Sequence, residues 1–423
     1  MSTQRAGRIA AAALALTLSA PAAGSAGNGV RLGGSEGRLH PFFEVEDRYD
    51  SNVYYSAAQK PVGDMVLHLR PGLELTVPGE LTAAELTGSL DWAQYLGLDV
   101  GQTKTQLSKL YGQADVGVSL NRRGQVGLEL DDEFRRAPGS NALILTNAVI
   151  SNYNTLRTRV PFRPGGGALV FTANGAWTLE SFDSYFTEPT CPGCTGNVSE
   201  FGYNEFRAGG DVKWKFLPRT AAMFQAGWFT RLPNDSAASD VSGLEVQAGL
   251  TGLVTPHLGA TLKAGYSGTY GVASGNVATG SVAIVSLETG NVKTWLSTVE
   301  AEWIATDSAS VKAGWTHGLG IDPGPALYTS NRVYGTGRIL LAGRYGLRFD
   351  ANFESRDYSP GSASASLIRL EPAFEAGLAR WMSASVGYAY SRRTSSSLPS
   401  TVAPLPVFDY TKNETWLRVG VRY

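Results

Sequence analysis

The chain has 423 residues, of which 43% are hydrophobic and only 17% are charged, and its formal net charge is -1 at pH 7. This balance gives no electrostatic reason to expect a nucleic-acid partner. After the N-terminal segment no apolar run approaches the roughly 20 residues of a membrane-spanning helix, which excludes a helical membrane protein.

The N-terminus has the pattern of a secretory signal peptide. Arg5 and Arg8 precede an apolar stretch, Ile9–Leu18, and small residues then offer cleavage sites after Ala22 or Ala26. A cytoplasmic amphipathic helix is the alternative interpretation of these residues. We expect a signal peptide at 1–26, a short periplasmic segment at 27–38 and a transmembrane β-barrel at 39–423.

Apolar and polar residues alternate along many later segments, which predicts β-strands. In Met65–Val77, leucines alternate with His68, Arg70 and Glu74. A soluble β-sandwich would alternate as well, but its connections would include Greek-key crossings. The same pattern predicts strands in Glu85–Leu96, Leu110–Leu120, Phe201–Phe216 and Arg344–Arg356.

Two cysteines lie in a polar stretch between predicted strands. Cys191 and Cys194 form Cys-Pro-Gly-Cys, and in an oxidising compartment a disulfide within this loop is the simplest interpretation. A thioredoxin-type site would need a helix after the first cysteine, and a zinc site would need two more ligands nearby. Neither is indicated, so we expect no metal and no cofactor.

The last segment, Thr411–Tyr423, places Leu417, Val419 and Val421 on one face and charged residues on the other. This is the alternation expected where lipid lies outside a barrel and water inside. The terminal aromatic residue, Tyr423, resembles the signal that the barrel-assembly machinery reads. We therefore expect the outer membrane of a Gram-negative bacterium as the location, and outer-membrane lipid and this machinery as partners.

Connections between the predicted strands are alternately short and long. Short turns are predicted at Pro78–Glu80, Asn121–Gly124, Arg163–Gly166, Pro218–Arg219, Thr255–His257, Thr306–Asp307, Ala342–Gly343 and Ala379–Arg380. Long loops are predicted at Asp50–Asp64, Gly97–Thr103, Ala137–Asn141, Asp183–Glu200, Pro233–Asp240, Gly271–Gly290, Gly320–Ser330, Ser359–Ala363 and Arg393–Asp409. Eight turns and nine loops predict an all-β, up-and-down antiparallel barrel of about eighteen strands, with the short turns in the periplasm.

A barrel of this size should enclose a water-filled channel, whereas an eight-stranded barrel is filled by its own side chains. Asp183–Glu200 and Gly271–Gly290 are candidates for loops that fold into the lumen. The predicted inward residues carry both signs of charge, which favours a lumen without strong ion selectivity. The candidate pore-lining residues are Arg70, Glu74, Lys109, Asp115, Glu129, Asp131, Glu133, Arg157, Arg159, Glu205, Arg207, Arg348 and Glu354.

Glu129, Asp131 and Glu133 form a possible acidic ladder on one strand. Facing Arg157 and Arg159 on the next strand, it could form a constriction with a transverse electric field. Structural pairing of opposite charges across strands is the more ordinary alternative.

Catalysis is a second class of function, because some outer-membrane barrels are enzymes. The four histidines are His40, His68, His257 and His317, and no Gly-x-Ser-x-Gly elbow is present. We therefore expect no catalytic residues and no enzyme activity.

The segment Phe42–Tyr55 (FFEVEDRYDSNVYY), with the glycine- and aromatic-rich strands that follow, resembles the first strand of the β-barrel porin 2 group of outer-membrane proteins. This group includes eighteen-stranded barrels of Wzx/Wzy-type exopolysaccharide export in myxobacteria. The resemblance implies a conduit for a secreted polysaccharide that works with a periplasmic polysaccharide export protein. It defines no functional residues.

Three functions remain open, in this order: a polysaccharide conduit, a general or sugar-selective diffusion porin for small polar solutes, and a barrel enzyme or structural anchor. The first is favoured by the wide lumen and by aromatic residues that could stack on sugar rings, namely Tyr111, Tyr153, Tyr203 and Trp416. Packing of these rings against inward loops is the alternative. A porin would be expected to carry a constricting loop.

Overall fold

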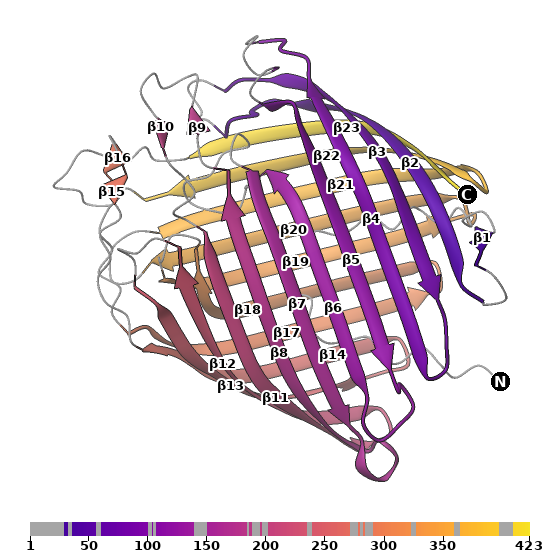
Figure 1. Cartoon of the computed structure of the whole chain (residues 1–423), viewed down its shortest axis with the longest axis vertical. Helices are drawn as coiled ribbons and strands as arrows, with labels where there is room; N and C mark the ends of the chain where they lie inside the picture. Colours follow the sequence, from indigo (N-terminus) through magenta and orange to yellow (C-terminus); the bar gives the residue numbers. More distant parts are fainter. Residues whose placement is uncertain are drawn as a thin grey trace.

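The protein folds into one closed β-barrel, seen from the side in Figure 1. The structure is a computed structural model that describes residues 29–32, 36–55, 61–99, 104, 107–138, 150–183, 186–187, 195–196, 202–234, 239–270, 278–279, 282–283, 291–322, 327–358, 364–396 and 409–423. The predicted signal peptide and the predicted Cys191–Cys194 disulfide lie outside these residues.

Eighteen strands form the barrel wall within the described residues. They are β2 (Arg38–Asp50), β3 (Asp64–Val77), β4 (Thr82–Tyr95), β5 (Lys109–Leu120), β6 (Leu128–Pro138), β7 (Ile150–Phe162), β8 (Leu169–Phe182), β11 (Tyr203–Leu217), β12 (Thr220–Pro233), β13 (Val241–Leu253), β14 (Leu258–Tyr270), β17 (Lys293–Thr306), β18 (Ala309–Ile321), β19 (Leu327–Leu341), β20 (Tyr345–Tyr358), β21 (Ser364–Ala379), β22 (Met382–Ser395) and β23 (Tyr410–Arg422). Each pairs antiparallel with its neighbours in sequence order, and β2 pairs with β23 to close the barrel. The predicted fold class and strand number are confirmed.

The eight predicted short turns all join consecutive strands at one end of the barrel. One of them contains the short helix η1 (Pro164–Gly166). Near the same end β1 (Val30–Arg31) pairs with the start of β2 (Figure 1). Two small sheets, β9 (Phe186–Thr187) with β10 (Thr195–Gly196) and β15 (Ala278–Thr279) with β16 (Val282–Ala283), lie at the long-loop end.

Period-two alternation puts apolar side chains on the outer wall and polar ones inside. On β23, Leu417 is 56% exposed on the outer face, whereas its neighbour Trp416 is 6% exposed on the inner face. No helix among the described residues is long and apolar enough to cross a membrane.

Most of the aromatic residues near strand ends face outward, in two groups. Trp214, Trp303 and Trp381 lie at the short-turn end and are all more than half exposed, while Tyr49 lies at the long-loop end. Tyr95 is an exception among these aromatic residues because it faces inward: it opposes the inward-facing Val66 and is only 5% exposed.

Candidate functional site

The inner wall of the barrel is the candidate site, and strand register places all the predicted pore-lining residues on it. Thr87 opposes Asp115, which in turn opposes Glu133, and Glu133 opposes Thr155, so the inward face can be followed from strand to strand. Inward side chains carry both signs of charge, whereas the outer wall carries most of the large exposed hydrophobic residues.

The acidic ladder and the two arginines meet as predicted. Glu129 lies opposite Arg159, and Asp131 lies opposite Arg157, on the adjacent strands β6 and β7. Arg157 forms its ion pair diagonally, with Nη2 3.2 Å from Oε2 of Glu133. This contact is a cross-strand ion pair along the wall, the more ordinary of the two predicted arrangements; whether the group also acts as a constriction stays a prediction.

Most of the remaining predicted residues also form ion pairs or hydrogen bonds along the wall. Arg207 Nε donates to Glu205 Oε1 at 2.6 Å, and the Arg348 guanidinium contacts Glu371 at 2.7 Å. Glu354 accepts from Arg356 at 2.8 Å, and Glu74 pairs with Arg422. Lys109 faces inward opposite Ala93 at the long-loop end. Paired charges keep the wall polar and hydrated while stiffening it.

The densest charge cluster spans the seam where the first and last barrel strands meet. Glu46 on β2 is completely buried and contacts three arginines, with oxygen to nitrogen distances of 2.6 Å to Arg48, 2.8 Å to Arg70 and 2.6 Å to Arg418. Arg48 also contacts Glu414 on β23 at 3.1 Å. We call these five residues the seam network. It ties β2, β3 and β23 together through side chains as well as backbone hydrogen bonds.

A segment that follows β2 folds into the lumen at the long-loop end. Val53 and Tyr54 are completely buried and belong to one apolar cluster with the inward-facing wall residues Val66, Tyr95 and Tyr111. The segment is fixed to β23 as well, because the Lys412 ammonium lies 2.8 Å from the Asp50 carboxylate and over the ring of Tyr55. The lumen is therefore narrowed on this side.

A second apolar cluster at the same end joins strands that are not neighbours. It consists of Phe229 on β12, Val241 on β13, Val292 before β17 and Leu327 on β19, with Leu319 and Ile321 of β18 packed against it. The part of the barrel around it is also held by the buried ion pair between Arg231 and Glu205, at 2.7 Å.

The inward aromatic residues are mostly unavailable for stacking on a sugar. Tyr111, Tyr203 and Trp416 are each 6% exposed. Tyr203 lies under the Arg231 guanidinium, whose central carbon is 3.8 Å from the ring centroid. Of the four predicted rings, these three pack against the wall or against inward segments, which was the alternative interpretation.

His68 and His317 have polar neighbours on the wall, and His317 is hydrogen-bonded to the Thr294 hydroxyl at 3.1 Å and to the Asn331 side chain at 2.8 Å. His68 Nδ1 lies 2.9 Å from Asp91, and no serine hydroxyl in the described part of the chain is hydrogen-bonded to the His68 ring. His317 faces outward, stacked on Trp295 with ring centroids 4.0 Å apart. No group of three or more His, Cys, Asp or Glu side chains in the described residues is arranged to hold a metal ion.

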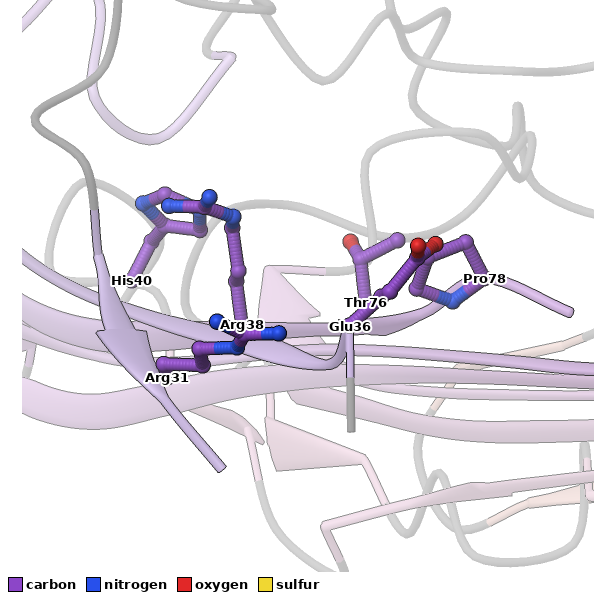
Figure 2. Close-up of a pocket in the computed structure, with 6 residues that line it drawn as sticks. All are labelled: Arg31, Glu36, Arg38, His40, Thr76 and Pro78. Atoms are coloured by element: carbon purple, nitrogen blue, oxygen red, sulfur yellow. The ribbon is translucent and has the colours of Figure 1, made fainter. Parts of the chain in front are cut away.

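A cavity of about 510 Å³ lies at the short-turn end, between β1, β2 and β3 (Figure 2). Its lining residues are Arg31, Glu36, Arg38, His40, Thr76 and Pro78. His40 Nδ1 lies 2.9 Å from the backbone oxygen of Tyr423, so the end of the chain is fixed beside this cavity.

The sequence pattern gave no signal for three features of the site. Inward folding of Val53 and Tyr54 depends on contacts with distant strands, and the inward position of Leu319 and Ile321 does so too. The three-arginine environment of Glu46 could not be foreseen, because alternation gives the face of a residue but not its neighbours across the seam.

No protein-family model matches the sequence, and no curated protein is significantly similar to it. These comparisons therefore do not show the resemblance to the β-barrel porin 2 group. Solved structures with a similar fold include OccK2 (OpdF) of Pseudomonas aeruginosa, at 11% identity and a TM-score of 0.45, covering 91% of this chain and 98% of that one. OccAB4 of Acinetobacter baumannii has 10% identity and a TM-score of 0.44, covering 91% and 98%. The ferric-catecholate import receptor Fiu of E. coli has 10% identity and a TM-score of 0.42, covering 90% and 81%.

Proposed function

We propose that this protein is an outer-membrane diffusion channel for small polar solutes. The observation that carries the proposal is the contrast between the two faces of the closed wall. Leu73, Leu90 and Phe349 are examples of the exposed apolar outer surface, whereas Arg70, Glu133 and Arg348 face inward. Eighteen strands are enough to leave an aqueous channel between such inner walls.

Small solutes fit the described mouth better than a polymer does. Val53 and Tyr54 on one side, and the cluster around Phe229 and Leu327 on the other, occupy space inside the long-loop end. The wall charges are mixed in sign and largely paired, so we infer weak ion selectivity. In this proposal the long-loop end faces outward and the short turns face the periplasm.

The polysaccharide conduit and its periplasmic export partner remain hypotheses that rest on the resemblance of Phe42–Tyr55. A single deletion experiment in the native host separates the two functions. Loss of the gene should slow uptake of small polar solutes and leave cell-surface polysaccharide unchanged. Loss of surface polysaccharide with unchanged small-solute uptake would contradict the proposal and favour the conduit.

Purified protein in planar lipid bilayers gives the direct test of a channel. We expect stepwise conductance with little preference between potassium and chloride. In the double variant Arg157→Ala, Arg159→Ala, a constriction at these residues predicts a shift toward cation preference, because Glu129, Asp131 and Glu133 then face the lumen without them. Unchanged selectivity would leave these residues as wall-stiffening pairs only. Absence of any conductance in the unmodified protein would refute the channel.

A further inference from the structure

The paired ends of β18 and β19, residues 319–322 and Leu327, lie inside the barrel, as strand phase shows; we call these residues the hairpin end. Leu319, Ile321 and Leu327 share the outward phase of β18 and β19 with Val333, which is 51% exposed. Leu327 is nevertheless completely buried against Phe229, and Phe229 faces inward because it pairs with Arg207. The outer face of one strand pair can touch the inner face of another only where the hairpin end has moved inside the wall.

Distance along the wall leads to the same conclusion. Three strands, β13, β14 and β17, separate β12 from β18, so the route along the wall is about 19 Å at a spacing of about 4.8 Å per strand. Yet Arg231 Nη1 on β12 donates to the carbonyl oxygens of Ile321 at 2.9 Å and of Asp322 at 3.0 Å. The hairpin end therefore reaches β12 through the lumen and not along the wall.

Arg231 is held in the geometry that this contact needs. Its Nε and Nη2 both donate to Glu205 Oε2, at 2.8 Å and 2.7 Å, and the ring of Tyr203 lies against its guanidinium. That leaves Nη1 directed at the two carbonyl oxygens, a fixed fork that a lysine could not reproduce. The side chain is 8% exposed, so water competes little for these bonds.

A second tether holds the same hairpin end from the opposite side. Arg356 Nη1 contacts Asp322 Oδ1 at 3.2 Å, and the Tyr358 hydroxyl donates to Asp322 Oδ2 at 2.9 Å. Gly320 leaves room for the Tyr328 ring beside the hairpin end, because a Cβ at this position would overlap that ring. The hairpin end is thus suspended between β12 and β20.

We propose that Arg231 is the residue that sets the upper size limit for solutes, by holding the hairpin end across the lumen. The proposal rests on the diffusion-channel function above. Without Arg231 the hairpin loses its bonds to β12, so the passage beside it widens. Loss of the positive charge alone does not explain such a change, because it would alter the preference for solute charge rather than the size limit.

The test is swelling of lipid vesicles that contain the full chain, in a series of uncharged sugars from mono- to tetrasaccharide. For Arg231→Gln we expect the tetrasaccharide rate, relative to the monosaccharide rate, to rise at least about threefold over the unmodified protein. Arg338→Gln is the matched control. This substitution also removes one inward positive charge, but at the short-turn end of β19, where Arg338 has no described contact with the hairpin end. Its size series should be unchanged.

The double variant Asp322→Asn, Tyr358→Phe loosens the opposite tether and leaves Arg231 intact, which covers the case in which Arg231→Gln does not fold. It should shift the size series in the same direction. An unchanged series in the folded hairpin variants, or an equal shift in Arg338→Gln, overturns the role of Arg231 and leaves the channel standing. Failure of the unmodified protein to admit even the monosaccharide overturns the proposed function itself.

Discussion

Replacing Glu46 with glutamine should weaken the barrel more than any other single loss of an inward carboxylate in the seam region. The change keeps the side-chain shape but removes the charge that Arg48, Arg70 and Arg418 share. Glu46 is completely buried, so water cannot replace the lost interaction.

The size of this destabilisation depends on the ion pairs that the arginines retain in the variant. Breaking a buried ion pair by removing one partner costs about 3–5 kcal/mol. Arg48 retains Glu414 at 3.1 Å and Arg70 retains Asp91 at 3.0 Å, which places Glu46→Gln near the lower end of that range. We therefore expect the free energy of unfolding to fall by about 3 kcal/mol, or about a hundredfold in the unfolding equilibrium.

The assay is equilibrium unfolding in urea from lipid vesicles, followed by tryptophan fluorescence, with the slope against urea checked for constancy. Glu44→Gln is the matched control, because Glu44 faces inward two residues away on β2 and has no ion pair among the described residues. It should change the free energy of unfolding by no more than about 0.5 kcal/mol. Equal effects of the two variants would refute the stabilising role of the seam network.

Three further predictions concern other parts of the molecule. Burial raises the pKa of the Asp322 carboxyl. The contribution of Asp322 to the free energy of unfolding is therefore full below the unfolded pKa of about 3.9, and it is lost as pH rises through the higher folded pKa. Asp322→Asn should remove this decline, and parallel pH profiles of variant and unmodified protein would contradict it. Trp381 is 55% exposed on the outer wall and Trp416 only 6% exposed on the inner wall, so brominated lipids should quench a single-tryptophan protein that retains Trp381 and spare one that retains Trp416. If the predicted disulfide between Cys191 and Cys194 forms, a thiol-alkylating reagent should add mass only after reduction; labelling without reductant would exclude the disulfide.

The strands and short turns could be predicted because both are local properties of the sequence. Alternation in Met65–Val77 and Thr411–Tyr423 matches β3 and β23 to within one residue at each end. Turn residues such as Pro78–Glu80 and Ala342–Gly343 lie where the structure turns. Face assignments followed from the same period of two, and for this reason all the predicted pore-lining residues are on the inner wall.

The mouth could not be predicted, because its geometry depends on contacts between distant segments. Gly320–Ser330 is predicted as a loop, yet β18 runs to Ile321 and β19 starts at Leu327. Packing of Leu327 on Phe229, almost a hundred positions earlier, leaves no local trace in the sequence. The inward position of Tyr95 could not be predicted either, since only strand register reveals it.

The seam has a consequence for how the barrel assembles. Its ion pair between Glu46 and Arg418 joins residues 372 positions apart, and bringing the ends of a flexible chain of that length together costs about 5 kcal/mol in entropy. Until β23 arrives, β2 and the most recently formed strand both present open edges, which are liable to pair with the wrong chain. The opposite charges on the two edges favour their correct meeting and hold them once they meet. Closure should accordingly be the slow step of folding, and the seam network should act on its rate as well as on the stability of the finished wall.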